Sequence, residues 1–334
     1  MADSPSSTTE HAPGALDRIR QLSASRQRED SPASSQKGRP TKKANRRAIL
    51  QSPEKVYTLF AALLVLLNAR IFYSSLAAQT ESVLLWFQPE QLRSLAAGAE
   101  SLTWSAPLDD VFIHFDFARS IAEGHPFEWI SGNGYSSGGT SLLYPFVLAA
   151  GYLGGYRGLE LMQWAAIVAC ISILGTLLGA RRLFRNLPPW TAFLAPVLFL
   201  STGVLNWTLF SGMEVALFLA IWSLCLVLWD DAWQHLELSS VPDAGESWSA
   251  LPATLLGLAS ALLVSIRPEA APLIAIFGFS LGLHTLKSTS GAGRWRRAFA
   301  TLLLSGVPAA CVMVGQMLTN HILTGDSSAA GALA

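Results

Sequence analysis

The sequence is short of charge for its length. Only 14% of its 334 residues are Asp, Glu, Lys or Arg, whereas 51% are hydrophobic. Soluble domains usually carry about 25% charged residues, so this composition excludes an ordinary soluble protein and predicts an integral membrane protein. The formal net charge is zero, and nothing in the sequence indicates a nucleic-acid partner.

Cysteine is also scarce. The three cysteines, Cys170, Cys225 and Cys311, all lie inside apolar runs, without CxxC or Cys/His spacing. This pattern favours small buried hydrophobic side chains over a disulfide or a metal-ligand set.

Residues 1–54 contain few large apolar side chains and many Ser, Pro, Arg, Lys and Gln residues. Such a segment cannot bury enough surface to offset the entropy lost on ordering. Basic residues at 42, 43, 46 and 47 directly precede the first apolar run, which is typical of a cytoplasmic anchor. We therefore expect a disordered, basic cytoplasmic tail. A signal peptide does not fit, and a transit peptide is the weaker alternative because the tail also carries acidic residues.

Seven apolar runs approach the ~20 residues that a bilayer core requires. They are residues 56–78, 159–180, 190–209, 212–230, 251–266, 268–286 and 298–318. A shorter apolar stretch, 141–155, contains Pro145 and predicts an interfacial or re-entrant helix. If 141–155 does not cross, the basic residues at 181–185 and 287–297 fall on the cytoplasmic side, as the positive-inside rule requires. The predicted fold is an all-α polytopic membrane protein of about seven spans.

This topology gathers polar residues on one non-cytoplasmic face. The first outer loop, residues 79–158, contains Asp109 and Asp110, and later turns place Glu214 and the Arg267–Glu269 turn on the same side. None of these residues was used to set the topology. Arg70, near the outer end of the first span, either extends to the interface or binds a lipid phosphate.

Residues 108–124 have Val111, Phe115, Ala118 and Ala122 at helical spacing, which predicts an amphipathic helix on the membrane surface. Asp109 and Asp110 then lie at its N-terminus, where one carboxylate would serve as a cap. Glycosyl transfer needs a carboxylate that accepts the proton of an attacking hydroxyl and a cation that stabilises a departing phosphate. The Asp pair could supply this base, and it could also hold a divalent metal.

Other polar residues have both a structural and a functional interpretation. Glu214 is either a helix-dipole partner or a cavity-lining carboxylate. Arg267 either pairs with Glu269 or faces an anionic phosphate. His114 and Arg119 either bind substrate or solvate the surface helix, where spacing favours an Arg119–Glu123 ion pair.

The same residues carry a resemblance to a known family. The run from Asp109 to His125, followed by Gly134 to Ser137, Ser211 to Glu214 and Arg267 to Glu269, resembles the spaced motifs of polytopic GT-C glycosyltransferases. The similar branch includes mycobacterial terminal arabinofuranosyltransferases and related mannosyltransferase-like proteins. The resemblance covers most of residues 55–334.

The resemblance implies an enzyme in the bacterial inner membrane that uses a polyprenyl-phosphate-linked sugar as donor and transfers it in the periplasm. The acceptor would be a cell-envelope glycan, lipid or protein. Asp109 and Asp110 match the catalytic acidic pair. Substrate contacts are then expected from His114, Arg119, Tyr135, Glu214, Arg267, Glu269 and Arg70.

Two other functions stay open. Family members usually continue past this point with further spans, whereas this sequence stops at Ala334, so a truncated or non-catalytic membrane protein is one alternative. A lipid or solute transporter is the other. Transporters usually place ionisable groups or broken helices near the bilayer midplane, and the sequence shows neither a clear internal repeat nor charges in the centres of the runs.

Overall fold

A computed structural model describes residues 53–87, 106–239, 248–289, 291 and 293–327. The chain divides into two units, Met1–Ser52 and Pro53–Ala334, and the description that follows concerns the second. The tail expected at 1–54 therefore lies almost wholly outside the described residues, as does the part of the first outer loop between 88 and 105.

All regular structure in these described ranges is helical, and the one β-type contact is an isolated bridge between Glu128 and Tyr135. The α-helices are α3 (Pro53–Phe87), α5 (Asp110–Ala122), α6 (Tyr144–Leu153), α7 (Leu161–Leu183), α8 (Pro189–Ser201), α9 (Gly203–Phe210), α10 (Val215–Ser239), α11 (Leu251–Ile266), α12 (Ala271–Ser288) and α13 (Arg294–Thr324). Two short 3-10 helices, η1 (Gly158–Glu160) and η2 (Pro268–Ala270), precede α7 and α12.

Within the described part of the chain, five helices are long and apolar enough to cross a membrane, and six if one bent pair counts as a span. Two of the seven expected spans account for the difference. The run 190–209 forms α8 and α9, which meet at an angle of 77° around Thr202. The run 251–266 forms α11, whose 16 residues fall short of the ~20 needed for a full crossing.

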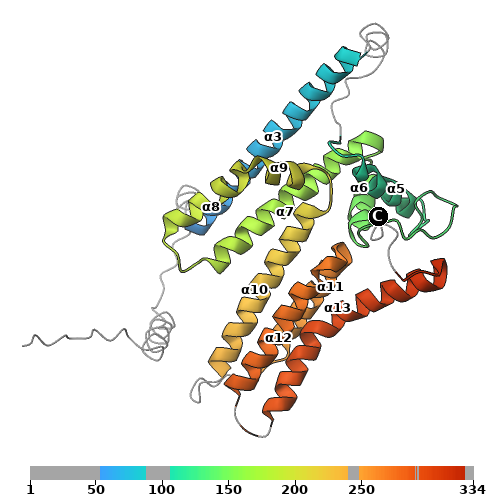
Figure 1. Cartoon of the computed structure of the whole chain (residues 1–334). Helices are drawn as coiled ribbons and strands as arrows, with labels where there is room; N and C mark the ends of the chain where they lie inside the picture. The colour runs from blue at the N-terminus through green and yellow to red at the C-terminus, as the bar shows by residue number, and fades with distance from the viewer. Residues whose placement is uncertain (1–52, 88–105, 240–247, 290, 292, 328–334) are drawn as a thin grey trace, which may run out of the picture. The chain divides into compact units, whose positions relative to one another are not determined.

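The helices pack in two neighbouring groups. Helix α10 contacts α7, α11 and α12, and α13 lies along α11 and α12, while α3 packs on α7, α8 and α9 (Figure 1). Gly257 lets α11 and α13 approach closely, because a Cβ atom built there would lie 2.0 Å from the Leu304 carbonyl oxygen. Small residues serve this purpose in membranes, where lipid removes most of the hydrophobic drive for helix association.

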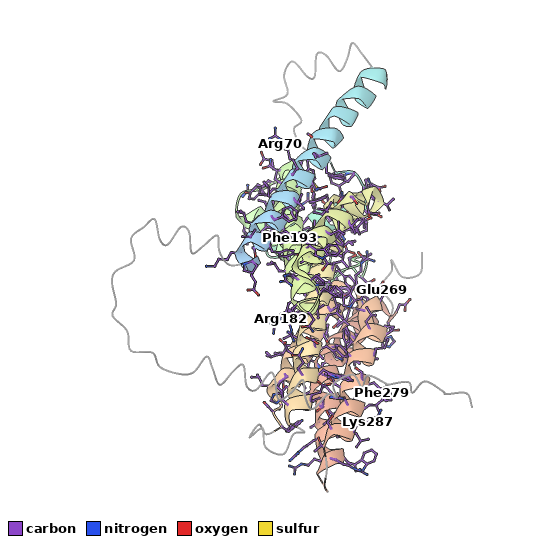
Figure 2. The ribbon with its side chains drawn as sticks, turned by 90° about the vertical axis from the view of Figure 1, so that its left-hand side faces the viewer. Arg70, Arg182, Phe193, Glu269, Phe279 and Lys287 are labelled. Carbon is purple, nitrogen blue, oxygen red and sulfur yellow. The ribbon has the colours of Figure 1, made fainter. Side chains whose placement is uncertain are left out.

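Polar turns lie at one end of this bundle, which we call the Glu214 end. It comprises α5, α6, residues 211–214, residues 267–270 and the C-terminal part of α13. The opposite end, the Arg182 end, carries the ion pair between Arg182 and Asp231 at 2.7 Å. Figure 2 shows Glu269 and Lys287 near the two ends of α12, with the exposed Phe279 between them.

The amphipathic helix expected at 108–124 is confirmed as α5. Val111, Phe115 and Ala118 are buried, and the chain leaves the helix at Gly124, which has a φ of +91°. The short helix expected within 141–155 is present as α6. Its re-entrant path through a membrane stays a prediction.

Candidate functional site

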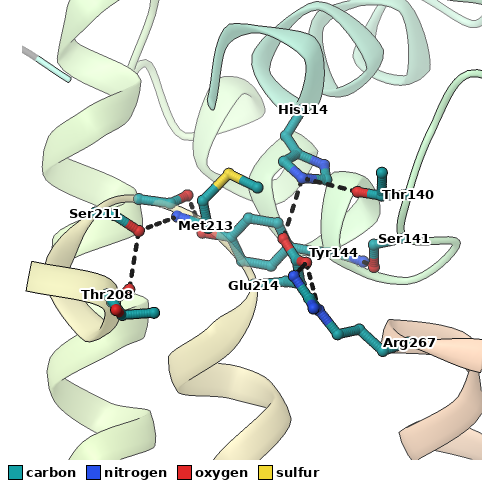
Figure 3. A network of polar contacts seen from close by, with 10 residues as sticks. His114, Thr140, Ser141, Tyr144, Thr208, Ser211, Met213, Glu214 and Arg267 are labelled. Atoms are coloured by element: carbon teal, nitrogen blue, oxygen red, sulfur yellow. Dashed lines mark hydrogen bonds and ion pairs between the residues drawn. The ribbon is translucent and has the colours of Figure 1, made fainter. Parts of the chain in front are cut away.

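Glu214 is the centre of a buried polar cluster. Its side chain is fully buried at the start of α10, immediately after Gly212 turns the chain with a φ of +91°. Oε1 accepts a hydrogen bond from Nε of Arg267 at 2.8 Å and lies 2.7 Å from Nη2. Oε2 lies 3.1 Å from Nε2 of His114. One carboxylate thus joins α5 to the end of α11 (Figure 3).

Local backbone chemistry brings Arg267 to this position. Arg267 has an extended conformation and Pro268 follows it, so α11 stops at Ile266 and the guanidinium can turn toward α10. The amides of Leu142 and Leu143 both donate to the Ser265 carbonyl at 2.9 Å, which ties the segment before α6 to the end of α11. The Arg267 side chain stays 40% exposed, so it can still meet a ligand.

The cluster keeps Glu214 ionised. Burial alone raises the pKa of this carboxyl group, but the neighbouring side chains of His114 and Arg267 outweigh it and lower the pKa to about 2. Of the two alternatives for Arg267, the ion pair with Glu269 is not formed, because Arg267 contacts Glu214 instead. Glu269 is exposed and has no ion pair or hydrogen bond among the described residues.

His114 is buried and does not solvate the helix surface. Its side chain is 1% exposed, and its ring packs edge-on against Tyr144 at a centroid distance of 5.4 Å. The Tyr144 hydroxyl donates to the Gly212 carbonyl at 2.7 Å, so α6 also holds the turn that carries Glu214. Nδ1 of His114 has no hydrogen-bond partner in the part of the chain that the structure describes.

Asp109 and Asp110 are both exposed at the N-terminus of α5. Asp109 is the N-cap residue, and its carboxylate accepts the amide of Asp110 at 3.1 Å. The carboxylate of Asp110 has no partner among the described residues, and it lies one helical turn before His114. No group of three or more His, Cys, Asp or Glu side chains that could hold a metal ion occurs within the described ranges, so the pair has no third ligand there.

The remaining predicted residues lie outside the Glu214 cluster. Arg119 pairs with Asp116 at 3.1 Å, so the expected pairing with Glu123 is wrong. Glu123 instead accepts hydrogen bonds from Ser131 and Tyr152. Arg70 projects from α3 and is exposed, without a polar partner among the residues described (Figure 2).

Tyr135 lines a small open cleft at the Glu214 end. The cleft lies between residues 127–142 and the C-terminal part of α13, and the Tyr135 hydroxyl donates to the side-chain oxygen of Asn320 across it. Sequence reasoning missed Asn320 and Gln316 on the α13 side. The sequence signal that could have found them is that each is an amide side chain within a largely apolar helix.

Together these observations define the class of protein. Its described residues form an all-helical structure with several helices long and apolar enough to cross a membrane, and one end of the bundle carries a buried ion cluster, an exposed acidic pair and a cleft. Comparison with protein-family models, with curated proteins and with solved structures finds no match for the chain.

Proposed function

We propose that this protein is a membrane glycosyltransferase that moves a sugar from a polyprenyl-phosphate donor to a cell-envelope glycan, lipid or protein acceptor. The observation that supports it is the placement of a base and a cation at one end of the bundle. Asp110 lies one turn, about 6 Å along the axis, from His114. Glu214 in turn holds His114 and the half-exposed Arg267 together.

This arrangement suits displacement of a sugar from phosphate. In the proposed reaction the acceptor hydroxyl loses its proton to Asp110, its oxygen bonds to the anomeric carbon, and the bond from that carbon to the phosphate oxygen breaks. Arg267 stabilises the negative charge that develops on the departing phosphate. Glu214 fixes the guanidinium and leaves part of it accessible.

The two aspartates have different roles in this proposal. The Asp109 carboxylate accepts the backbone amide of Asp110 at the N-terminus of α5. Asp110 has no such contact and is therefore the general base. The possible divalent metal at this pair is not needed for this step, because the proton acceptor and the phosphate partner are both side chains.

The charge distribution supports an orientation. Arg181 and Arg182 lie in the last turn of α7, Arg185 follows it, and three arginines open α13, so the positive-inside rule favours a cytoplasmic position for both of these helix ends. The Glu214 end then faces the periplasm of a bacterial inner membrane, where a polyprenyl-phosphate donor is reached from the lipid.

The test is transfer of labelled sugar from a panel of polyprenyl-phosphate donors in membranes that contain the protein. The Asp109→Asn, Asp110→Asn double variant should lose transfer. The matched control is Asp231→Asn, which removes an exposed carboxylate at the Arg182 end. Equal transfer by the double variant and the parent would refute the proposed site. Absence of transfer with every donor would refute the function and favour a non-catalytic membrane protein or a transporter.

A further inference from the structure

The cleft beside Tyr135 differs chemically from the Glu214 cluster. None of the described side chains that line it is formally charged, whereas a phosphate or a phospholipid headgroup needs a cation. Its walls combine aromatic rings with amides and hydroxyls. The rings are Phe117, Phe127 and Phe146, and the polar groups include Ser137, Gln316 and Asn320.

Several of these polar groups are unused within the protein. The side chains of Gln316 and Ser137 make no hydrogen bond with any described residue, and Asn320 uses only its oxygen, leaving its amide nitrogen available. Asn320 is also 97% buried, because its exposed fraction is 3%. Ser137 and Gln316 are partly exposed, so their donors and acceptors can be reached by a ligand that carries several hydroxyls.

One aromatic residue of the cleft, Phe127, has a strained backbone conformation. Phe127 has a φ of +66°, a left-handed conformation that non-glycine residues rarely adopt. Its ring packs edge-on against Phe146 at 5.6 Å, and Phe117 stacks with Trp129 at 6.2 Å. Strained backbone of this kind persists mainly at binding and catalytic sites.

Helix α13 is longer than a bilayer core requires. Helix α13 has 31 residues and begins with three arginines within four positions, whereas ~20 residues cross the hydrocarbon. Gln316 and Asn320 follow Pro308 in this helix and line the cleft at the Glu214 end.

We propose that this cleft binds a neutral sugar ring of an acceptor glycan, with aromatic rings against its C–H face and the amides of Gln316 and Asn320 on its hydroxyls. The inference rests on the proposed function in one respect, since it selects a glycan from the three acceptor classes considered there. The charged donor phosphate and the neutral acceptor ring thus occupy separate parts of the Glu214 end.

The test measures glycan binding without requiring transfer. The full chain is placed in lipid nanodiscs, because a maltoside detergent would itself supply sugar headgroups. Saturation-transfer NMR is recorded with neutral trisaccharides of glucose, mannose and arabinose. Binding should be detected for at least one probe, and the Ser137→Ala, Gln316→Leu double variant should weaken it about tenfold or more, at roughly fivefold for each lost hydrogen bond.

The matched control is Thr319→Val, on an exposed position of α13 whose hydroxyl bonds its own helix at Gly315. This variant should bind as the parent does. Absence of binding by the parent for every probe, or equal binding by the parent and the double variant, would overturn the proposal.

Asp110→Asn separates the two proposals, because it should abolish transfer while leaving trisaccharide binding intact. Binding without any transfer would refute the enzyme but not the sugar site.

Discussion

Glu214 and Arg267 are 53 positions apart in the chain, yet the guanidinium meets the carboxylate through Nε at 2.8 Å and Nη2 at 2.7 Å. The contact joins the start of α10 to the end of α11. Because one partner is fully buried, the pair is sensitive to the loss of either member.

Replacing Glu214 with Gln should destabilise the protein by about 2–4 kcal/mol, because Arg267 would lose its buried counter-charge. The measurement is chemical unfolding of the parent, Glu214→Gln, Arg267→Met and the double variant in nanodiscs. The cost of the double variant should be smaller than the sum of the two single costs. Additive losses would show that the two residues act independently.

The ionised state of Glu214 should make stability depend on pH. The folded pKa, about 2, lies below the ordinary value of 4.5, so this contribution is fully present above about pH 4.5 and is lost as pH falls toward 2. Its size is on the order of 3 kcal/mol. Unfolding midpoints of the parent and Glu214→Gln should therefore converge as pH falls from about 6 to about 2.5. A difference that stays constant over this range would contradict the assignment.

Single substitutions should separate the two aspartates. Asp110→Asn removes the proposed base and should lower kcat by about 10²- to 10⁴-fold. Asp109→Asn should retain most transfer, because Asn is as good an N-cap as Asp. Both rates are measured with the same labelled donor. A larger loss for Asp109→Asn than for Asp110→Asn would reverse the assigned roles.

The close approach of α11 and α13 should be intolerant of a methyl group. A Cβ at Gly257 would strike the Leu304 carbonyl, so Gly257→Ala should cost about 1–3 kcal/mol through overpacking. Gly306→Ala is the control, because nothing lies within 4 Å of its Cβ position and alanine favours a helix. The thermal unfolding temperature should fall for Gly257→Ala and should stay unchanged or rise for Gly306→Ala.

Orientation can be measured by cysteine labelling in a background without Cys170, Cys225 and Cys311. Asn133→Cys should react with a membrane-impermeant maleimide in intact spheroplasts. Gly293→Cys, at the start of α13, should react only after permeabilisation. The reverse pattern would place the Glu214 end in the cytoplasm.

Local sequence signals predicted the local structure well. The helix at 108–124, its buried face and its stop at Gly124 follow from 3.6-residue periodicity and glycine conformation, and both require only neighbouring residues. The partner of Arg267 could not be predicted this way, because spacing offered Glu269 two residues away whereas the fold supplies Glu214 from another helix. The burial of His114 likewise depends on the position of α6. The bend at Thr202 separates two apolar segments whose combined composition resembles one continuous span.

The chain order of the Glu214 cluster also bears on how the protein is made. His114 precedes Glu214 along the chain, but Arg267 is synthesised 53 residues later. At about 5–20 residues per second, a ribosome needs roughly 3–10 s to cover that distance. For this interval Glu214 enters the nascent membrane assembly without its arginine, so biogenesis must shelter a lone acidic group until α11 is complete.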